Sequence, residues 1–90
     1  MKLIVYVAKW SAYDRVCESW VPRLPVDDRE IIHYEDDDEL PWWAGDAKQR
    51  RHRTPIWGLF AGELLFMGNH HGLMTEQQAA AWIREAKKHL

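Results

Sequence analysis

The sequence predicts a small α/β domain with a four-stranded mixed sheet, in β-α-β-α-β-β-α order. Three observations predict it. The chain opens on an apolar, β-branched run from Lys2 to Lys9, typical of a strand that is covered on both faces. Two later apolar runs meet at Ala61-Gly62, which is a hairpin signal, and the last residues have helical periodicity. Because no linker or repeat interrupts residues 1–90, we expect a single domain.

The first half of the chain alternates strands and helices. Residues 12–21 predict a helix that two prolines end, with an inner face formed by Val16, Cys17 and Trp20. Glu30 to Tyr34 predicts a second strand, so this unit favours a right-handed crossover between parallel strands. Pro41 precedes a predicted second helix over 42–51, whose basic last turn suits the helix dipole.

The second half predicts a hairpin and a closing helix. Pro55 to Phe60 and Glu63 to Met67 predict the two hairpin strands, and Gly68 to Leu73 predicts a loop. Thr75 and Gln78 have the spacing of a capping box. The helix that follows has an apolar stripe formed by Ala79, Ile83, Ala86 and Leu90.

Composition excludes several classes of protein. A single cysteine forms no intramolecular disulfide, no Cys-x-x-Cys pair and no cysteine-rich zinc site, which favours a reducing, cytoplasmic location. The longest apolar stretch, Leu3 to Ala8, is far shorter than the roughly 20 residues that span a bilayer, and no signal peptide is expected. Six tryptophans exceed the needs of a small core, so one or two are expected at a contact surface.

Charge is distributed unevenly along the chain. Residues 27–39 contain eight acidic residues and one arginine, whereas 48–53 contain Lys48, Arg50, Arg51 and Arg53. Solvated faces or mutual ion pairs are the simpler interpretation. The alternatives are an acidic patch for a basic partner and a basic patch for nucleic acid, and four basic residues beside an acidic run make nucleic acid the weaker hypothesis.

Three stretches, taken in order, resemble the thioredoxin-like family. Where thioredoxins have Trp-Cys-Gly-Pro-Cys-Lys after the first strand, this chain has Trp10-Ser11-Ala12-Tyr13-Asp14-Arg15. Thr54-Pro55 matches the cis-proline that opens the family's third strand, and Met67-Gly68-Asn69 matches a Val-Gly loop before its last helix. The resemblance covers nearly the whole chain, is weakest over 27–50, and implies a thioredoxin-like fold.

The departures from the family bear on function. Ser11 and Asp14 stand where the attacking and resolving cysteines would be, and neither can form a disulfide. The family's buried acid on the first strand falls at Val5. We therefore expect no enzymatic activity and no cofactor. Cys17 lies nearly one turn further into the helix and is expected in the core, although a thiol-dependent oxidoreductase or glutathione-linked enzyme using Cys17 is the alternative.

Two other groups of side chains have simple interpretations. Ser11 and Asp14 with a histidine would suggest nucleophilic catalysis, but both residues also favour a helix N-terminus, and we prefer capping. His70 and His71 with His33 would suggest a metal site. Adjacent histidines in an extended segment point apart and no ligand spacing recurs, so we expect no metal.

The resemblance also implies a binding groove beside Pro55, where the family pairs with the backbone of its substrates. Without the cysteines, such a groove can still hold a peptide through strand-like hydrogen bonds. The sequence therefore predicts a redox-inactive protein-binding module, such as an accessory or phage-encoded factor that engages a host protein. Either this groove or the charged segment 27–53 is the binding face. The expected groove residues are Trp10, Ser11, Ala12, Tyr13, Arg53, Thr54, Pro55, Met67, Gly68, Asn69 and His70.

Overall fold

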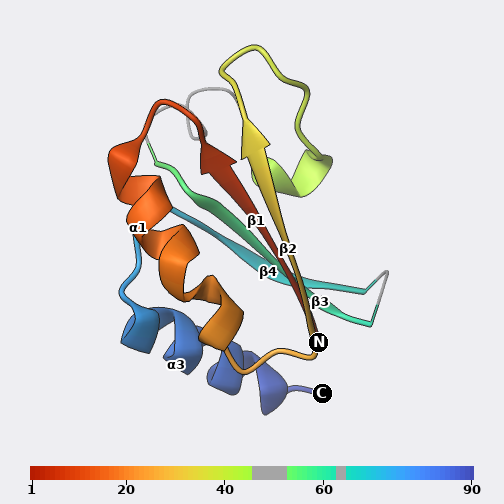
Figure 1. The fold of residues 1–90 in the computed structure, drawn as a ribbon. Coiled ribbons are helices and arrows are strands. Elements are labelled where there is room, and N and C mark those ends of the chain that lie inside the picture. Colours follow the sequence, from red (N-terminus) through yellow and green to blue (C-terminus); the bar gives the residue numbers. More distant parts are fainter. Residues whose placement is uncertain (46–52, 63–64) are drawn as a thin grey trace.

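The computed structural model describes residues 1–45, 53–62 and 65–90. They form a small α/β domain in which a four-stranded mixed sheet has two α-helices on one face (Figure 1). The predicted fold class is confirmed at this level. In chain order the elements are β1 (Lys2–Ala8), α1 (Ala12–Trp20), β2 (Asp28–Tyr34), β3 (Ile56–Ala61), β4 (Leu65–His71) and α3 (Glu76–Lys87).

The sheet has the strand order β2-β1-β3-β4. β1 pairs in parallel with β2 and antiparallel with β3, and β3 pairs antiparallel with β4. β1 is therefore an inner strand with side chains buried on both faces, which explains its nearly continuous apolar run. Its residues Leu3, Val5 and Val7 are fully buried on the face that the helices cover.

The two faces of the sheet have separate cores. On the helix face, Trp20 of α1 stacks on Trp57 of β3 with ring centroids 5.7 Å apart, and Ile83 of α3 belongs to the same cluster. On the opposite face, the short 3₁₀ turn Trp42–Ala44 places Trp43 against Phe60, with ring centroids 5.7 Å apart. The described residues thus supply two helices to one face and an aromatic turn to the other.

The last strand is longer than the sequence predicted. We expected a strand ending at Met67 and a loop from Gly68, but β4 continues to His71, with Gly68 opposite Leu59 and His70 opposite Trp57. The loop prediction was therefore wrong over Gly68–His71, whereas Gly72 and Leu73 do lie in a loop. In an antiparallel ladder the pairing is made by backbone groups, which glycine also supplies.

The predicted second helix is not present where it was expected to begin. Trp42–Ala44 forms a single 3₁₀ turn, followed by Gly45 with a φ of 83°, and residues 46–52 lie outside the described residues. Only the start of this prediction is therefore contradicted. A φ in the left-handed region at a glycine is a common way to stop a helical turn.

The helix faces were predicted in part. Cys17 and Trp20 of α1 are buried as expected, and the capping box at Thr75 and Gln78 is present at the start of α3. Val16 was expected inside but is 63% exposed, because the inner stripe follows Cys17 and Trp20 and Val16 lies about 100° around the helix from Cys17. Leu90, placed on the inner stripe of the last helix, is instead 69% exposed because α3 ends at Lys87.

Neither helix within the described residues has the length and apolar character required to cross a membrane.

Gly58 of β3 provides a test of the packing behind the sheet. A Cβ at this position would lie 2.6 Å from Cζ3 of Trp43, so Gly58→Ala must displace a buried indole. We expect a loss of about 1–3 kcal/mol in the free energy of unfolding, measured by urea denaturation. Gly68→Ala is the matched control, since a Cβ there meets no atom within 4 Å. Equal stability of the two variants would contradict the close contact between Trp43 and β3.

Candidate binding groove

Asp14 connects three separate segments of the chain. Its Oδ2 accepts a hydrogen bond of 2.8 Å from the Ala8 N–H at the end of β1, and its Oδ1 accepts one of 3.0 Å from the Thr54 hydroxyl. The side chain is fully buried, and this burial raises the pKa of Asp14, although the hydrogen bonds that it accepts oppose the shift. The carboxyl group therefore positions the start of α1 against the segment that leads into β3.

The capping prediction for this turn is confirmed for one of its two residues. Ser11 is the N-cap of α1, and its Oγ accepts a hydrogen bond of 3.3 Å from the Asp14 N–H. Asp14 lies in the first turn, but its carboxylate bonds to Ala8 and Thr54 rather than to the helix amides. The sequence pattern identified the acidic first turn without revealing that this acid is buried.

The Thr54–Pro55 peptide bond is cis, in agreement with what the resemblance implied. Pro55 is buried, and its carbonyl oxygen accepts a hydrogen bond of 2.9 Å from the Gly72 N–H. The segment beside the cis-proline is therefore the Gly72–Leu73 loop between β4 and α3. It is not Met67-Gly68-Asn69, which the resemblance had placed there and which lies within β4.

The expected groove residues are brought together only in part. Trp10 to Tyr13 lie at the start of α1, which Asp14 links to Thr54 and Pro55. Asn69 instead directs its Nδ2 to the Trp43 carbonyl, at 2.6 Å, on the face opposite the helices. Arg53 is exposed and lies near Gly72. Met67, Gly68 and Asn69 are therefore separated from Pro55, and the Trp10 ring lies against Tyr34, with centroids 5.4 Å apart.

The two adjacent histidines point to opposite faces of the sheet. The His70 ring lies 6.4 Å from that of Trp82 on the helix face, where burial and then neighbouring His71 lower the pKa of His70. His71 Nε2 is 2.7 Å from the Ala44 carbonyl oxygen on the other face. His33 pairs with Glu18 of α1 at 2.6 Å. Among the described residues, no group of three or more potential ligands gathers to hold a metal ion.

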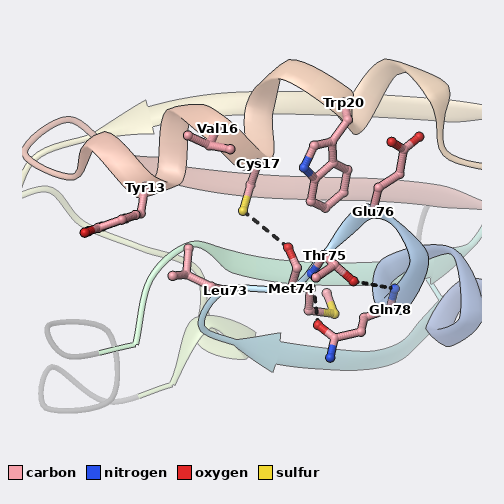
Figure 2. Close-up of a pocket in the computed structure, with 9 residues that line it drawn as sticks. All are labelled: Tyr13, Val16, Cys17, Trp20, Leu73, Met74, Thr75, Glu76 and Gln78. Atoms are coloured by element: carbon pink, nitrogen blue, oxygen red, sulfur yellow. Dashed lines mark hydrogen bonds between the residues drawn. The ribbon is translucent and has the colours of Figure 1, made fainter.

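A groove that sequence reasoning missed lies between α1 and the loop that leads into α3 (Figure 2). It has a volume of about 480 Å³, and most of its exposed lining is apolar. Tyr13, Val16 and Leu73 are exposed along it, with exposed fractions of 71%, 63% and 53%. Cys17, Trp20 and Met74 are buried beneath them, and Thr75, Glu76 and Gln78 complete the lining.

One signal in the sequence would have located this groove. Tyr13 and Val16 have the i, i+3 spacing of an apolar stripe, next to the buried stripe formed by Cys17 and Trp20. A nine-residue helix that packs on one face needs only one of these stripes. The second stripe therefore leaves two large apolar side chains on the helix surface.

The groove has few charged groups, and its one carboxylate is paired. Glu76 accepts two hydrogen bonds from the Arg23 guanidinium, at 2.8 and 3.0 Å. These bonds hold the pKa of Glu76 below its usual value and raise that of Arg23. The Cys17 thiol donates to the Met74 carbonyl at 3.6 Å, and burial raises the pKa of Cys17. The groove therefore favours an uncharged, apolar ligand over a thiolate reaction.

Comparison of the chain with protein-family models, with curated proteins and with solved structures found no match.

The charged segments are described only in part. The acidic residues that follow β2 are exposed, and Lys9 pairs with Glu35 at 3.7 Å. Of the basic residues considered for nucleic acid, Lys48, Arg50 and Arg51 lie outside the described residues.

The raised pKa of Asp14 predicts a pH dependence of stability. Because the folded chain binds this proton more tightly than the unfolded chain, stability falls as pH rises from the ordinary carboxyl value of 3.8 through the higher folded value. An asparagine can accept from Ala8 and donate to Thr54 without this cost. We therefore expect Asp14→Asn to gain stability relative to the original chain between about pH 4 and pH 7.

Urea denaturation at several pH values measures this difference. Asp14→Ala is the matched variant that removes both hydrogen bonds, and it is expected to lose about 2–4 kcal/mol. If the original chain instead became more stable than Asp14→Asn as pH rises, the raised pKa of Asp14 would be contradicted.

Proposed function

We propose that this chain is a redox-inactive thioredoxin-like domain that binds another protein through the groove between α1 and the loop before α3. The observation that supports this proposal most directly is the exposure of three large apolar side chains, Tyr13, Val16 and Leu73, along one cavity. Isolated exposed apolar residues are ordinary, but residues gathered along a cavity indicate an interaction site.

The order and pairing of the elements support the thioredoxin-like part of the proposal. A parallel β1–β2 pair is followed by an antiparallel β3–β4 hairpin, and α1 and α3 cover the same face (Figure 1). A cis-proline precedes β3, and Asp14 joins its neighbour Thr54 to the start of α1. These are the relationships that the resemblance implies between the first helix and the third strand.

The chemistry at the start of α1 supports a binding role over a redox role. Ser11 is occupied as the helix cap, and Asp14 is occupied in two hydrogen bonds, so neither is available as a nucleophile at the groove. The remaining thiol, Cys17, is 4% exposed and has a raised pKa, which disfavours the thiolate that disulfide exchange requires.

The ligand that suits this groove is a segment of a partner protein with one or two large apolar side chains. The floor and rim offer Tyr13 and Met74, which are residue types enriched at protein interfaces, and Val16 and Leu73 add apolar surface. Arg53, which is exposed, and Thr54, which is half-buried, precede the cis-proline at the same end of α1, and their backbone can pair with an extended segment. The apolar groove would then bind the side chains of a peptide whose backbone pairs with the segment before the cis-proline.

Binding through the groove predicts different effects for two exposed side chains. A photo-crosslinking amino acid at Leu73 should capture the partner, and its bound segment can be identified by mass spectrometry. With that segment as a synthetic peptide, Tyr13→Ala should raise the dissociation constant at least tenfold, measured by calorimetry. Leu90→Ala is the control, because Leu90 is similarly exposed at 69% but is not part of the groove. Equal affinity of the two variants would place the binding face elsewhere.

The absence of redox activity is tested separately. In an insulin-disulfide reduction assay with dithiothreitol, we expect the chain to show no rate above the uncatalysed background, and Cys17→Ser to behave identically. Turnover that disappears in Cys17→Ser would overturn the redox-inactive part of the proposal and favour the thiol-dependent enzyme.

A further inference from the structure

β4 is an outer strand of the sheet with unusually little protection. The strand order places β3 on one side of it, and within the described residues no strand pairs with its other side. An open edge exposes backbone N–H and C=O groups that can pair with another chain, and proteins usually block it with charged side chains or proline. The seven residues Leu65–His71 contain no Asp, Glu, Lys, Arg or Pro.

The other outer strand, β2, is charged where β4 is not. β2 begins with Asp28, Arg29 and Glu30, and Lys2 of the neighbouring strand pairs with both of its acids, at 3.9 and 3.5 Å. Another strand that added to β2 would have to desolvate these charges. Of the two outer strands, only β4 offers pairing without that cost.

An exposed apolar cluster lies beside the β4 edge. Trp42, 77% exposed, contacts Phe66 of β4 with ring centroids 5.0 Å apart. The adjacent Leu65, 65% exposed, adds an apolar side chain on the other face of the strand. This cluster is separate from the groove, because Trp42 belongs to the turn that covers the other face of the sheet. An uncharged edge and an apolar cluster at the same strand both point to a covering chain.

We infer that β4 pairs with β4 of a second copy of this chain, which joins the two sheets in a two-fold symmetric dimer. In a two-fold interface every side chain meets the same surface of the partner, so any charge near the axis faces its own copy. A strand without charged residues meets this condition, which a partner of different sequence would not impose. Self-pairing therefore explains the lack of charge along β4 better than capture of an arbitrary peptide.

The structure also indicates where along β4 the pairing is centred. A register shift between Leu59 and Phe60 separates Leu65–Phe66 from the regular ladder of Gly68–His71. Gly68 begins this ladder, and a Cβ built on it meets nothing within 4 Å, so the face of the sheet is open at this position. We place the two-fold axis near Gly68 and Asn69, which brings Trp42 and Phe66 of each copy to the flanks of the interface.

The surface available is close to the lower limit for a specific dimer. An aromatic side chain buries up to about 150–250 Å² when it is fully covered. The interface would contain the largely exposed Trp42 and the half-buried Phe66 from both copies. With the strand backbones and Leu65 added, this approaches the roughly 1,000 Å² that a specific interface requires. The dimer does not depend on the proposed groove, since neither Tyr13 nor Leu73 takes part in it.

Charged side chains introduced near the two-fold axis test this inference. By sedimentation velocity, the full chain should be a dimer at micromolar concentrations, and Gly68→Lys and Gly68→Glu should each raise the dimer dissociation constant at least tenfold. An equimolar mixture of the two variants should form the dimer again, because unlike charges then meet near the axis. Circular dichroism verifies that both variants are folded. A third variant, Trp42→Ser, lies outside β4 and should also weaken the dimer.

Three outcomes would overturn the inference. These are a monomeric chain at the highest concentration measured, a dimer that withstands both Gly68 variants, and variants that stay monomeric when mixed. Tyr13→Ala is the control for the groove and should remain dimeric. A dimer lost only in Tyr13→Ala would show that copies associate through the groove, which contradicts pairing at β4 and also challenges the proposed function. Loss of peptide binding with an intact dimer would concern the groove alone.

Discussion

The buried carboxyl group of Asp14 makes the interactions on which the arrangement at the start of α1 depends. It lies in the first turn of α1 and accepts hydrogen bonds from the end of β1 and from Thr54, beside the cis-proline. These segments are 6 and 40 residues away in sequence. An isolated buried carboxyl would be costly, but two donors satisfy this one. The start of α1, the end of β1 and the start of β3 are thereby held in one arrangement.

This arrangement determines what the neighbouring groove can do. With Asp14 directed inward and Ser11 capping the helix, the polar atoms at the start of α1 are used within the fold. The large apolar side chains left on the surface of α1 are Tyr13 and Val16, which line the groove together with Leu73. The first turns of α1 therefore present an apolar surface at the groove. A polar anchor inside and an apolar rim outside are suited to recognition rather than to thiol exchange.

Sequence patterns predicted the parts of the fold that local physics controls. The first strand, the buried face of α1 at Cys17 and Trp20 and the capping box at Thr75 follow from periodicity and hydrogen-bonding chemistry over a few residues. The bonds from Asp14 to Ala8 and Thr54 were not predictable in this way, because an acid in the first helical turn has an adequate local explanation. The strand through Gly68 was missed for a related reason: its pairing with Leu59 across the hairpin overrides the local preference of glycine.

The groove and the β4 edge lie on different parts of the domain, and this separation has a consequence for binding. If two copies join at β4, each keeps its own groove between α1 and the loop before α3, since no groove residue is consumed in the sheet pairing. A partner that displays two copies of the bound segment would then meet two sites held at a fixed spacing. Its second contact would be intramolecular, which raises the overall affinity without any new interaction at the groove. A domain of 90 residues with one modest apolar groove gains in this way a strength of binding that the groove area alone would not provide.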